Sequence, residues 1–273
     1  PSNSSAASDV YKRQEVWNIP EKETRHAAHL AWEEQRRAKA DVRAAGAKAL
    51  ADMEKNGGSG IVLAGRPYHV DPEINHGIPE LIAAYGLTVL TEDCLPIDFV
   101  PKRPVRVNDQ WVYHSRLYTA AEFVCGRDDL ELIQLNSFGC GLDAVTTDEV
   151  CELLEQGGKL YTCLKIDEVN NLGAVRIRIR SLLAAVAMRR ERGIHSTSHV
   201  QPFERVYYTK EMQKQHYTIL APQMSPIHFD LLEPIFKKYG YHIKVLANDN
   251  RAAIDMGLKL SLIHISEPTR LGM

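Results

Sequence analysis

From residue 58 onward, short apolar runs alternate with segments of helical pattern, and this alternation limits the possible folds more than any other feature. Each run has the length of a strand, and glycines or polar loops separate it from the next helix. Strand, helix and strand joined by short loops form right-handed units with parallel strands. We therefore expect an α/β fold with a Rossmann-like or flavodoxin-like parallel sheet. The expected strands are 61–65, 87–90, the run that begins at Leu132, and 160–166; the expected helices are 71–85, 111–125, 143–156 and 172–192.

The same pattern divides the chain into an N-terminal helix and two α/β segments. Residues 15–57 are expected to be a helical connector, because the apolar positions of its long helix are mostly alanines and its buried face is thin. Residues 58–195 are expected to form the α/β domain. Residues 196–259 return to the order strand, helix, strand, so we expect the truncated start of a second α/β domain there.

The two ends of the chain are related to each other through their coding DNA. Asp9–Gln14 back-translates to DNA whose reverse complement encodes Leu260–Ile265. Both ends therefore resemble translated sequencing adapters. We expect residues 1–14 and 260–273 to be adapter-derived and to pack poorly on the rest of the chain.

Composition excludes several classes of protein. The net charge of −2 provides no basic field for nucleic acid, and no apolar run approaches the ~20 residues that span a bilayer. The five cysteines are odd in number and lack the spacing of a disulfide framework, which favours a reducing cytoplasm. We expect a cytoplasmic protein without nucleic-acid or membrane partners.

Reactive and polar residues follow each of the four expected strands of the α/β domain. The carboxyl ends of parallel strands share one edge of a sheet, and open α/β sheets bind ligands there. Arg66 and Tyr68 are candidates for cofactor binding, together with Gly139 and Gly141. His69, Asp167 and Glu168 are candidates for catalysis, and Cys94 and Cys140 for binding a metal.

Cys140, between two glycines on a tight turn, has several possible roles. Its thiol could bind a soft metal or an iron–sulfur cluster with Cys94, attack a substrate with His69 as base, or be buried and inert. The glycines alone could cradle a phosphate at the start of a helix, although the full motif is absent. The carboxylates of Asp167 and Glu168 could act in catalysis, cap the following helix or pair with arginines on it.

Four motifs resemble one family. The segments Gly65–Pro79, Ser137–Asp148, Lys165–Arg178 and Leu220–Phe229 resemble the activase-related proteins of the 2-hydroxyacyl-CoA dehydratase system, and the resemblance covers nearly all of 58–259. Long chains of that family join activator-type ATPase modules to a region that is similar to the dehydratase subunits. This chain resembles part of the latter region.

The resemblance implies a function and a cofactor. Dehydratase subunits hold a [4Fe–4S] cluster through cysteines on strand-end loops, and Cys94 and Cys140 match those positions. The implied function is ATP-driven, low-potential electron transfer to a CoA thioester or a similar substrate. The implied partners are an ATPase activator module and an acyl-CoA-type small molecule. Two alternatives remain open: a non-redox module that binds CoA or a nucleotide, and a cofactor-free scaffold between ATPase and reductase parts.

Overall fold

The structure is a computed structural model that describes residues 16–97, 101, 105–106, 109, 111–137, 141–166, 172–197, 203–247 and 249–260. The order of elements confirms the predicted alternation. After the long helix α2 (Glu21–Lys55) come β1 (Gly60–Ala64), η1 (Pro67–Val70), α3 (Pro72–Asn75), α4 (Ile78–Ala83), β2 (Thr88–Thr91), η2 (Glu92–Cys94), α5 (Val112–Cys125), β3 (Leu130–Ser137), α6 (Gly141–Gln156), β4 (Thr162–Ile166) and α7 (Leu172–Glu191). The chain continues with α8 (Lys210–Lys214), β5 (Thr218–Pro222), α9 (Pro226–Lys238), β6 (His242–Leu246) and α10 (Arg251–Leu260).

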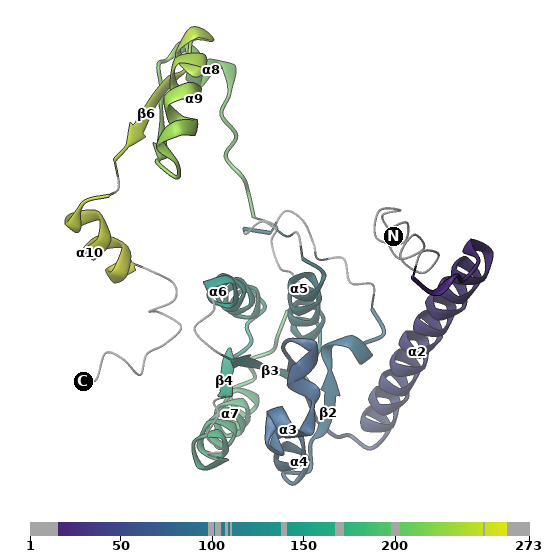
Figure 1. The fold of residues 1–273 in the computed structure, drawn as a ribbon. Helices are drawn as coiled ribbons and strands as arrows, with labels where there is room; N and C mark the ends of the chain where they lie inside the picture. Colours follow the sequence, from purple (N-terminus) through teal and green to yellow (C-terminus); the bar gives the residue numbers. More distant parts are fainter. Residues whose placement is uncertain are drawn as a thin grey trace.

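The first four strands form one parallel sheet in the order β2-β1-β3-β4. Helices α5 and α6 lie on one side of this sheet, and α4 and α7 lie on the other (Figure 1). The strand order and the covering helices confirm the expected α/β fold of the Rossmann or flavodoxin type. β1 is central and buried along its whole length, as its uninterrupted apolar sequence predicts.

Two apolar cores fill the two faces of the sheet, because successive side chains of a strand point to opposite sides. Val62 and Ala64 of β1 join the core beneath α5, α6 and the end of α2. Ile61 and Leu63 join the core that α4 and α7 cover. Since each face of β1 is fully covered, the exits of the central strands are held rigidly at the edge of the sheet.

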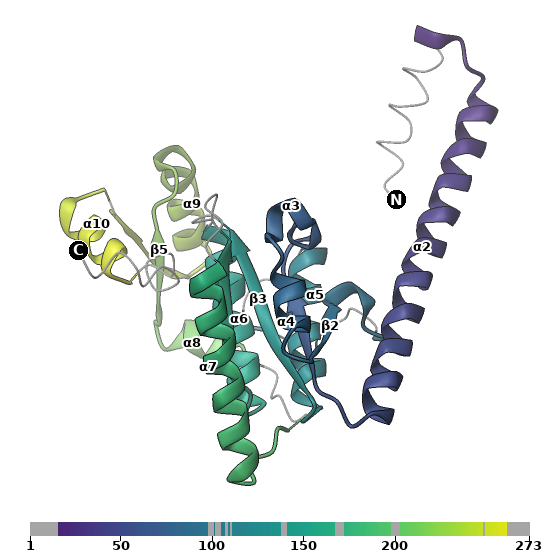
Figure 2. The same ribbon diagram turned by 90° about the horizontal axis from the view of Figure 1, so that it is seen from below.

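Helix α2 contacts β2 and η2 of the described domain through its C-terminal part. Most of its length is exposed, as its alanine-rich sequence predicts, and Leu50 and Met53 are buried near its end. Figure 2 shows the remainder extending away from the sheet. A Cβ at Gly46 would overlap the carbonyl oxygen of Cys94, so any larger residue there would collide with η2.

The expected single helix over 71–85 is wrong in one respect. The structure divides this segment into α3 and α4, and the separate turn η1 precedes it. The chain breaks between α3 and α4 because His76 and Gly77 both adopt left-handed backbone angles, with φ of 53° and 82°. Left-handed residues end a helix, and Pro79 then fits the first turn of the next one.

Residues 203–260 form a separate, small unit. β5 and β6 pair in parallel, and α9 connects them and packs on β6. The strand, helix, strand order agrees with the sequence pattern. Among the described residues of this unit, every side chain is exposed or only partly buried.

Two sequence predictions concern chain ends and membranes. The two ends, residues 1–14 and 260–273, lie almost entirely outside the described residues, so their adapter origin and their poor packing stay predictions. Within the described part of the chain, no helix combines the length and apolar character that a membrane span requires.

Candidate functional site

The exits of β1 and β3 lie side by side at the carboxyl edge of the sheet. β1 and β3 pair in parallel, with Ala64 opposite Gln134, so the residues that follow β1 meet the last residues of β3. Gly65 then turns the chain into η1. A Cβ at Gly65 would collide with the ring of His69 and lie 3.2 Å from the carbonyl of Leu135. The glycine therefore lets η1 fold His69 back against the sheet.

His69 takes part in a chain of hydrogen bonds that links β1 to β3. The backbone N–H of Arg66 donates to Nδ1 of His69 over 2.9 Å, so the ring proton of the neutral imidazole is on Nε2. Nε2 lies 3.1 Å from Oγ of Ser137 and donates to it. The same Oγ lies 2.9 Å from the hydroxyl of Tyr68. The chain thus runs from the buried imidazole to a tyrosine that is 38% exposed.

The position of His69 determines its charge. Burial lowers the pKa of His69 to about 4; nearby Asp143 partly opposes this shift, and Arg66 adds to it. The ring is therefore neutral at neutral pH, in agreement with its accepting role at Nδ1. A base with so low a pKa is weak at neutral pH. The geometry favours a hydrogen-bonding role for His69, and its predicted catalytic role stays a prediction.

Arg66 and Asp143 form an ion pair that connects the β1 exit to α6. Nη2 and Nε of Arg66 lie 2.6 and 3.1 Å from the same carboxylate oxygen of Asp143. Asp143 is in the first turn of α6, where the helix dipole stabilises an acidic side chain. The pair is only partly exposed to solvent, so solvent screens it less than a surface pair.

A second ion pair, which the sequence analysis missed, lies at the exit of β2. Glu92 is 3% exposed, and Arg116 of α5 donates to it over 2.7 Å. Burial raises the pKa of Glu92 to about 7, although Arg116 opposes the shift. Arg116 also lies 3.6 Å from Asp93. The position of Glu92 directly after an expected strand was the available signal, but its partner is 24 residues away in the chain.

The structure places Cys94 in the apolar core and not at the open edge. The residue is 8% exposed and packs with Leu50 and Met53 of α2. Burial raises the pKa of its thiol, which disfavours the thiolate that binds metals and attacks substrates. Its predicted role as a cluster ligand stays a prediction.

Several predicted site residues lie outside the described residues: Gly139, Cys140, Asp167 and Glu168. Their proposed roles therefore stay predictions, as does the expected closeness of Cys94 and Cys140. Gly141 begins α6. In the parts of the chain that the structure describes, no three His, Cys, Asp or Glu side chains are grouped so as to hold a metal ion.

Comparison with known proteins gives one match. Residues 2–95 match the family described as the CoA enzyme activase uncharacterised domain (DUF2229). The matched part contains β1, η1 and β2, and so Arg66, Tyr68, His69 and Glu92, but it ends before Ser137 and Asp143. Neither the curated proteins nor the solved structures gave a match. The family match supports a relation to an activase-related CoA-enzyme family.

Proposed function

We propose that the four-stranded domain binds an acyl-CoA-type molecule at its carboxyl edge, as part of a CoA-enzyme activation system. The observation that carries this proposal is the convergence of Arg66, Tyr68 and His69 from the β1 exit with Ser137 and Asp143. The family match includes the β1 exit, which is why a CoA-type ligand is favoured over other ligands. An ATPase activator module, in the same or another chain, is the partner that such a system requires.

The direction of the hydrogen bonds gives Tyr68 a specific role in this proposal. Because Nε2 of His69 donates to Ser137, the serine hydroxyl is available to donate to the oxygen of Tyr68. The proton of Tyr68 then points to a ligand and can donate to the thioester carbonyl. His69 and Ser137 act as positioning residues. Arg66 pairs with Asp143 at the same edge and holds the β1 exit against α6.

The test compares the binding of CoA and acetyl-CoA by isothermal titration calorimetry at neutral pH. Only acetyl-CoA has the carbonyl that Tyr68 would contact. We expect Tyr68→Phe to weaken acetyl-CoA binding about tenfold, which corresponds to the loss of one hydrogen bond, and to leave CoA binding unchanged. Tyr239→Phe is the matched control, because Tyr239 is exposed at the end of α9.

Three results would count against the proposal. Absence of saturable binding of both molecules to the unmodified chain would leave a scaffold role as the better account. An equal loss of CoA and acetyl-CoA affinity in Tyr68→Phe would remove the carbonyl contact. The same loss in Tyr239→Phe would show that the effect is not specific to this edge.

The iron–sulfur function that the sequence predicts is a narrower proposal. It rests on Cys140 and Cys94 together with ligands from elsewhere, and the buried position of Cys94 makes Cys140 the residue to test first. After anaerobic purification, iron content should fall in Cys140→Ser and remain in Cys163→Ser. Equal iron content in both variants, or none in the unmodified chain, would end this proposal.

A further inference from the structure

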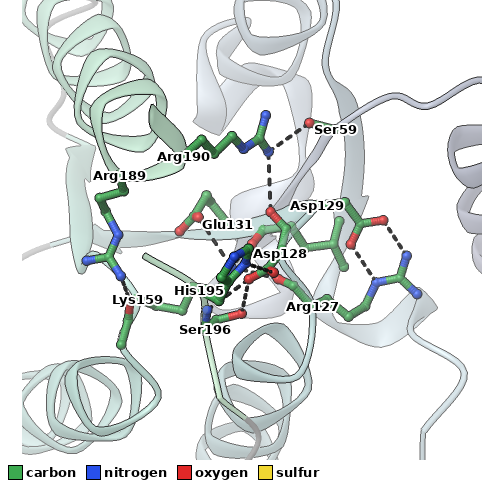
Figure 3. Close-up of polar contacts among 12 residues, drawn as sticks. Ser59, Arg127, Asp128, Asp129, Glu131, Lys159, Arg189, Arg190, His195 and Ser196 are labelled. Atoms are coloured by element: carbon green, nitrogen blue, oxygen red, sulfur yellow. Dashed lines mark hydrogen bonds and ion pairs between the residues drawn. The ribbon is translucent and has the colours of Figure 1, made fainter. Parts of the chain in front are cut away.

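A cavity of about 500 Å³ lies at the amino edge of the sheet, opposite the site described above. Its walls come from five segments that are distant in sequence: 54–59 between the end of α2 and β1, 128–131 at the start of β3, 158–159 before β4, 186–190 of α7, and 194–196. This volume is within the range of small-molecule sites. Figure 3 shows the polar contacts among side chains in this region.

The carboxylates of the cavity wall already have cationic partners. Asp129 lies 2.5 Å from Arg127, which also pairs with Glu54 at 2.7 Å. Glu131 lies 3.2 Å from Nζ of Lys159. That ammonium also donates to the carbonyls of Arg127 and Leu130 over 2.6 and 2.7 Å, so its hydrogen-bonding capacity is filled.

Arg189 and Arg190 differ from these residues, because their hydrogen bonds go to neutral oxygens, although both are close enough to Glu131 to oppose the rise that burial causes in its pKa. Arg189 donates to the carbonyl of Gly158. Arg190 donates to Oγ of Ser59 over 3.0 Å and to the carbonyl of Asp128 over 3.3 Å. Among the described residues, neither guanidinium has a carboxylate within 4 Å. Each guanidinium has five N–H donors, so donors remain on both.

The helix dipole explains part of this arrangement. Cations in the last turn of a helix are ordinarily stabilised by its dipole, and both arginines are in the last turn of α7. The dipole does not require that two adjacent arginines line one cavity. Two arginines that line a pocket and lack a carboxylate partner are a typical arrangement for binding an oxyanion.

We infer that this amino-edge cavity binds a small molecule through an oxyanion, a phosphate or a carboxylate, that Arg189 and Arg190 hold. Val186 and Ile194 supply an apolar wall for the body of the ligand. A second oxygen of Glu131, Oε2, is buried and has no hydrogen-bond partner within the described part of the chain. A donor group on the ligand would satisfy it.

One wall of the cavity is a short strap, residues 194–197, that Asp128 holds in place. Oδ1 of Asp128 accepts from the backbone N–H and the hydroxyl of Ser196, over 2.8 and 2.7 Å. Oδ2 lies 2.8 Å from Nδ1 of His195. These bonds, the one from the Ser196 N–H first, lower the pKa of Asp128. The cavity therefore has a defined shape before any ligand enters, which reduces the entropy cost of binding.

The test uses inorganic phosphate and acetate as probes, at constant ionic strength set with sodium chloride. Thermal unfolding of the full chain should shift upward with phosphate and approach saturation, because a ligand that binds only the folded state stabilises it. Arg189→Gln and Arg190→Gln should each weaken the apparent phosphate affinity about tenfold. Arg192→Gln is the matched control, since Arg192 is exposed at the same helix end and does not line the cavity.

A second measurement keeps the test independent of folding defects. Amide resonances of Ser59 and Gly158 should shift on addition of phosphate in the unmodified chain and not in Arg190→Gln. A larger effect of acetate than of phosphate would assign the site to carboxylates. Absence of a saturable response, or equal responses of Arg190→Gln and Arg192→Gln, would overturn the inference. None of these results depends on CoA binding at the carboxyl edge.

Discussion

The carboxyl and amino edges of the four-stranded sheet differ in how their charged side chains are paired. At the carboxyl edge, Arg66 pairs with Asp143 and Arg116 with Glu92, and the hydrogen-bond chain from His69 ends at the half-exposed Tyr68. At the amino edge, the carboxylates are paired, but Arg189 and Arg190 contact neutral oxygens beside a cavity. The first edge is suited to donate a hydrogen bond to a neutral group, and the second to hold an anion.

The difference has a local physical origin. The β1 exit turns back at Gly65 and buries its own polar groups, so each must be satisfied within the protein. At the amino edge, segments that end helices lie beside segments that begin strands, and a cavity remains between these segments.

The largest expected effect concerns the opposing titrations of His69 and Glu92. Folding lowers the pKa of His69 to about 4, so its contribution to stability is present above pH 6.5 and is lost as pH falls toward 4. Folding raises the pKa of Glu92 to about 7, so its contribution is present below pH 4.5 and is lost as pH rises toward 7. Between about pH 4.5 and 6.5, the rise of stability with pH from His69 and its fall with pH from Glu92 should cancel.

Urea denaturation of single variants at a series of pH values should reveal how each residue makes the free energy of unfolding depend on pH. Relative to the unmodified chain, Glu92→Gln should gain stability as pH rises from 4.5 to 6.5, and His69→Gln should lose it. Each slope should be about 1.4 kcal/mol per pH unit, or about 3 kcal/mol in all. If stability changed with pH in the same way in both variants, the opposite pKa shifts of His69 and Glu92 would be contradicted.

The next effect concerns the turn at Gly65. Gly65→Ala places a methyl group against the ring of His69 and the carbonyl of Leu135, so the free energy of unfolding should fall by about 2–3 kcal/mol. Gly257→Ala is the control: its Cβ would have no neighbour within 4 Å among the described residues, and alanine favours a helix. Equal denaturation midpoints for the two variants would show that the β1 exit is less tightly packed than described.

The smallest effect on global stability is expected at the amino-edge strap. Asp128→Ala removes the bonds to His195 and Ser196, but Asp128 is exposed, so the free energy of unfolding should change by less than about 1 kcal/mol. The amide of Ser196 should nevertheless exchange with deuterium about tenfold faster. Asp52→Ala, at an exposed position of α2, should change neither quantity. An unchanged exchange rate at Ser196 in Asp128→Ala would show that Asp128 does not hold the strap.

The sequence predicted the sheet well because its strands are continuous apolar runs. β1 and β3 are recognisable from composition alone, and the short loops between strands and helices require parallel pairing. The residues of the β1 exit were also identifiable, since they follow a buried strand. The direction of the His69 ring could not be identified from the sequence, because it depends on the space that Gly65 leaves.

Other features depend on contacts that no local pattern reveals. The break at His76 and Gly77 arises from two left-handed residues, one of which is not glycine. The pair of Glu92 and Arg116 joins separate elements, and a core cysteine such as Cys94 has the same sequence signature as a ligand. The amino-edge cavity has walls from five segments, so no single motif could predict it.

The most direct test of the account is to map backbone amide shifts of the full chain on addition of acetyl-CoA. The account predicts shifts at Arg66, Tyr68, His69 and Ser137, on the carboxyl edge, and predicts that these shifts diminish in Tyr68→Phe. Shifts at Ser59, Asp128 and Gly158, on the amino edge, without any at the β1 exit, would contradict it. In that case the CoA-type ligand would belong to the cavity beside Arg189 and Arg190.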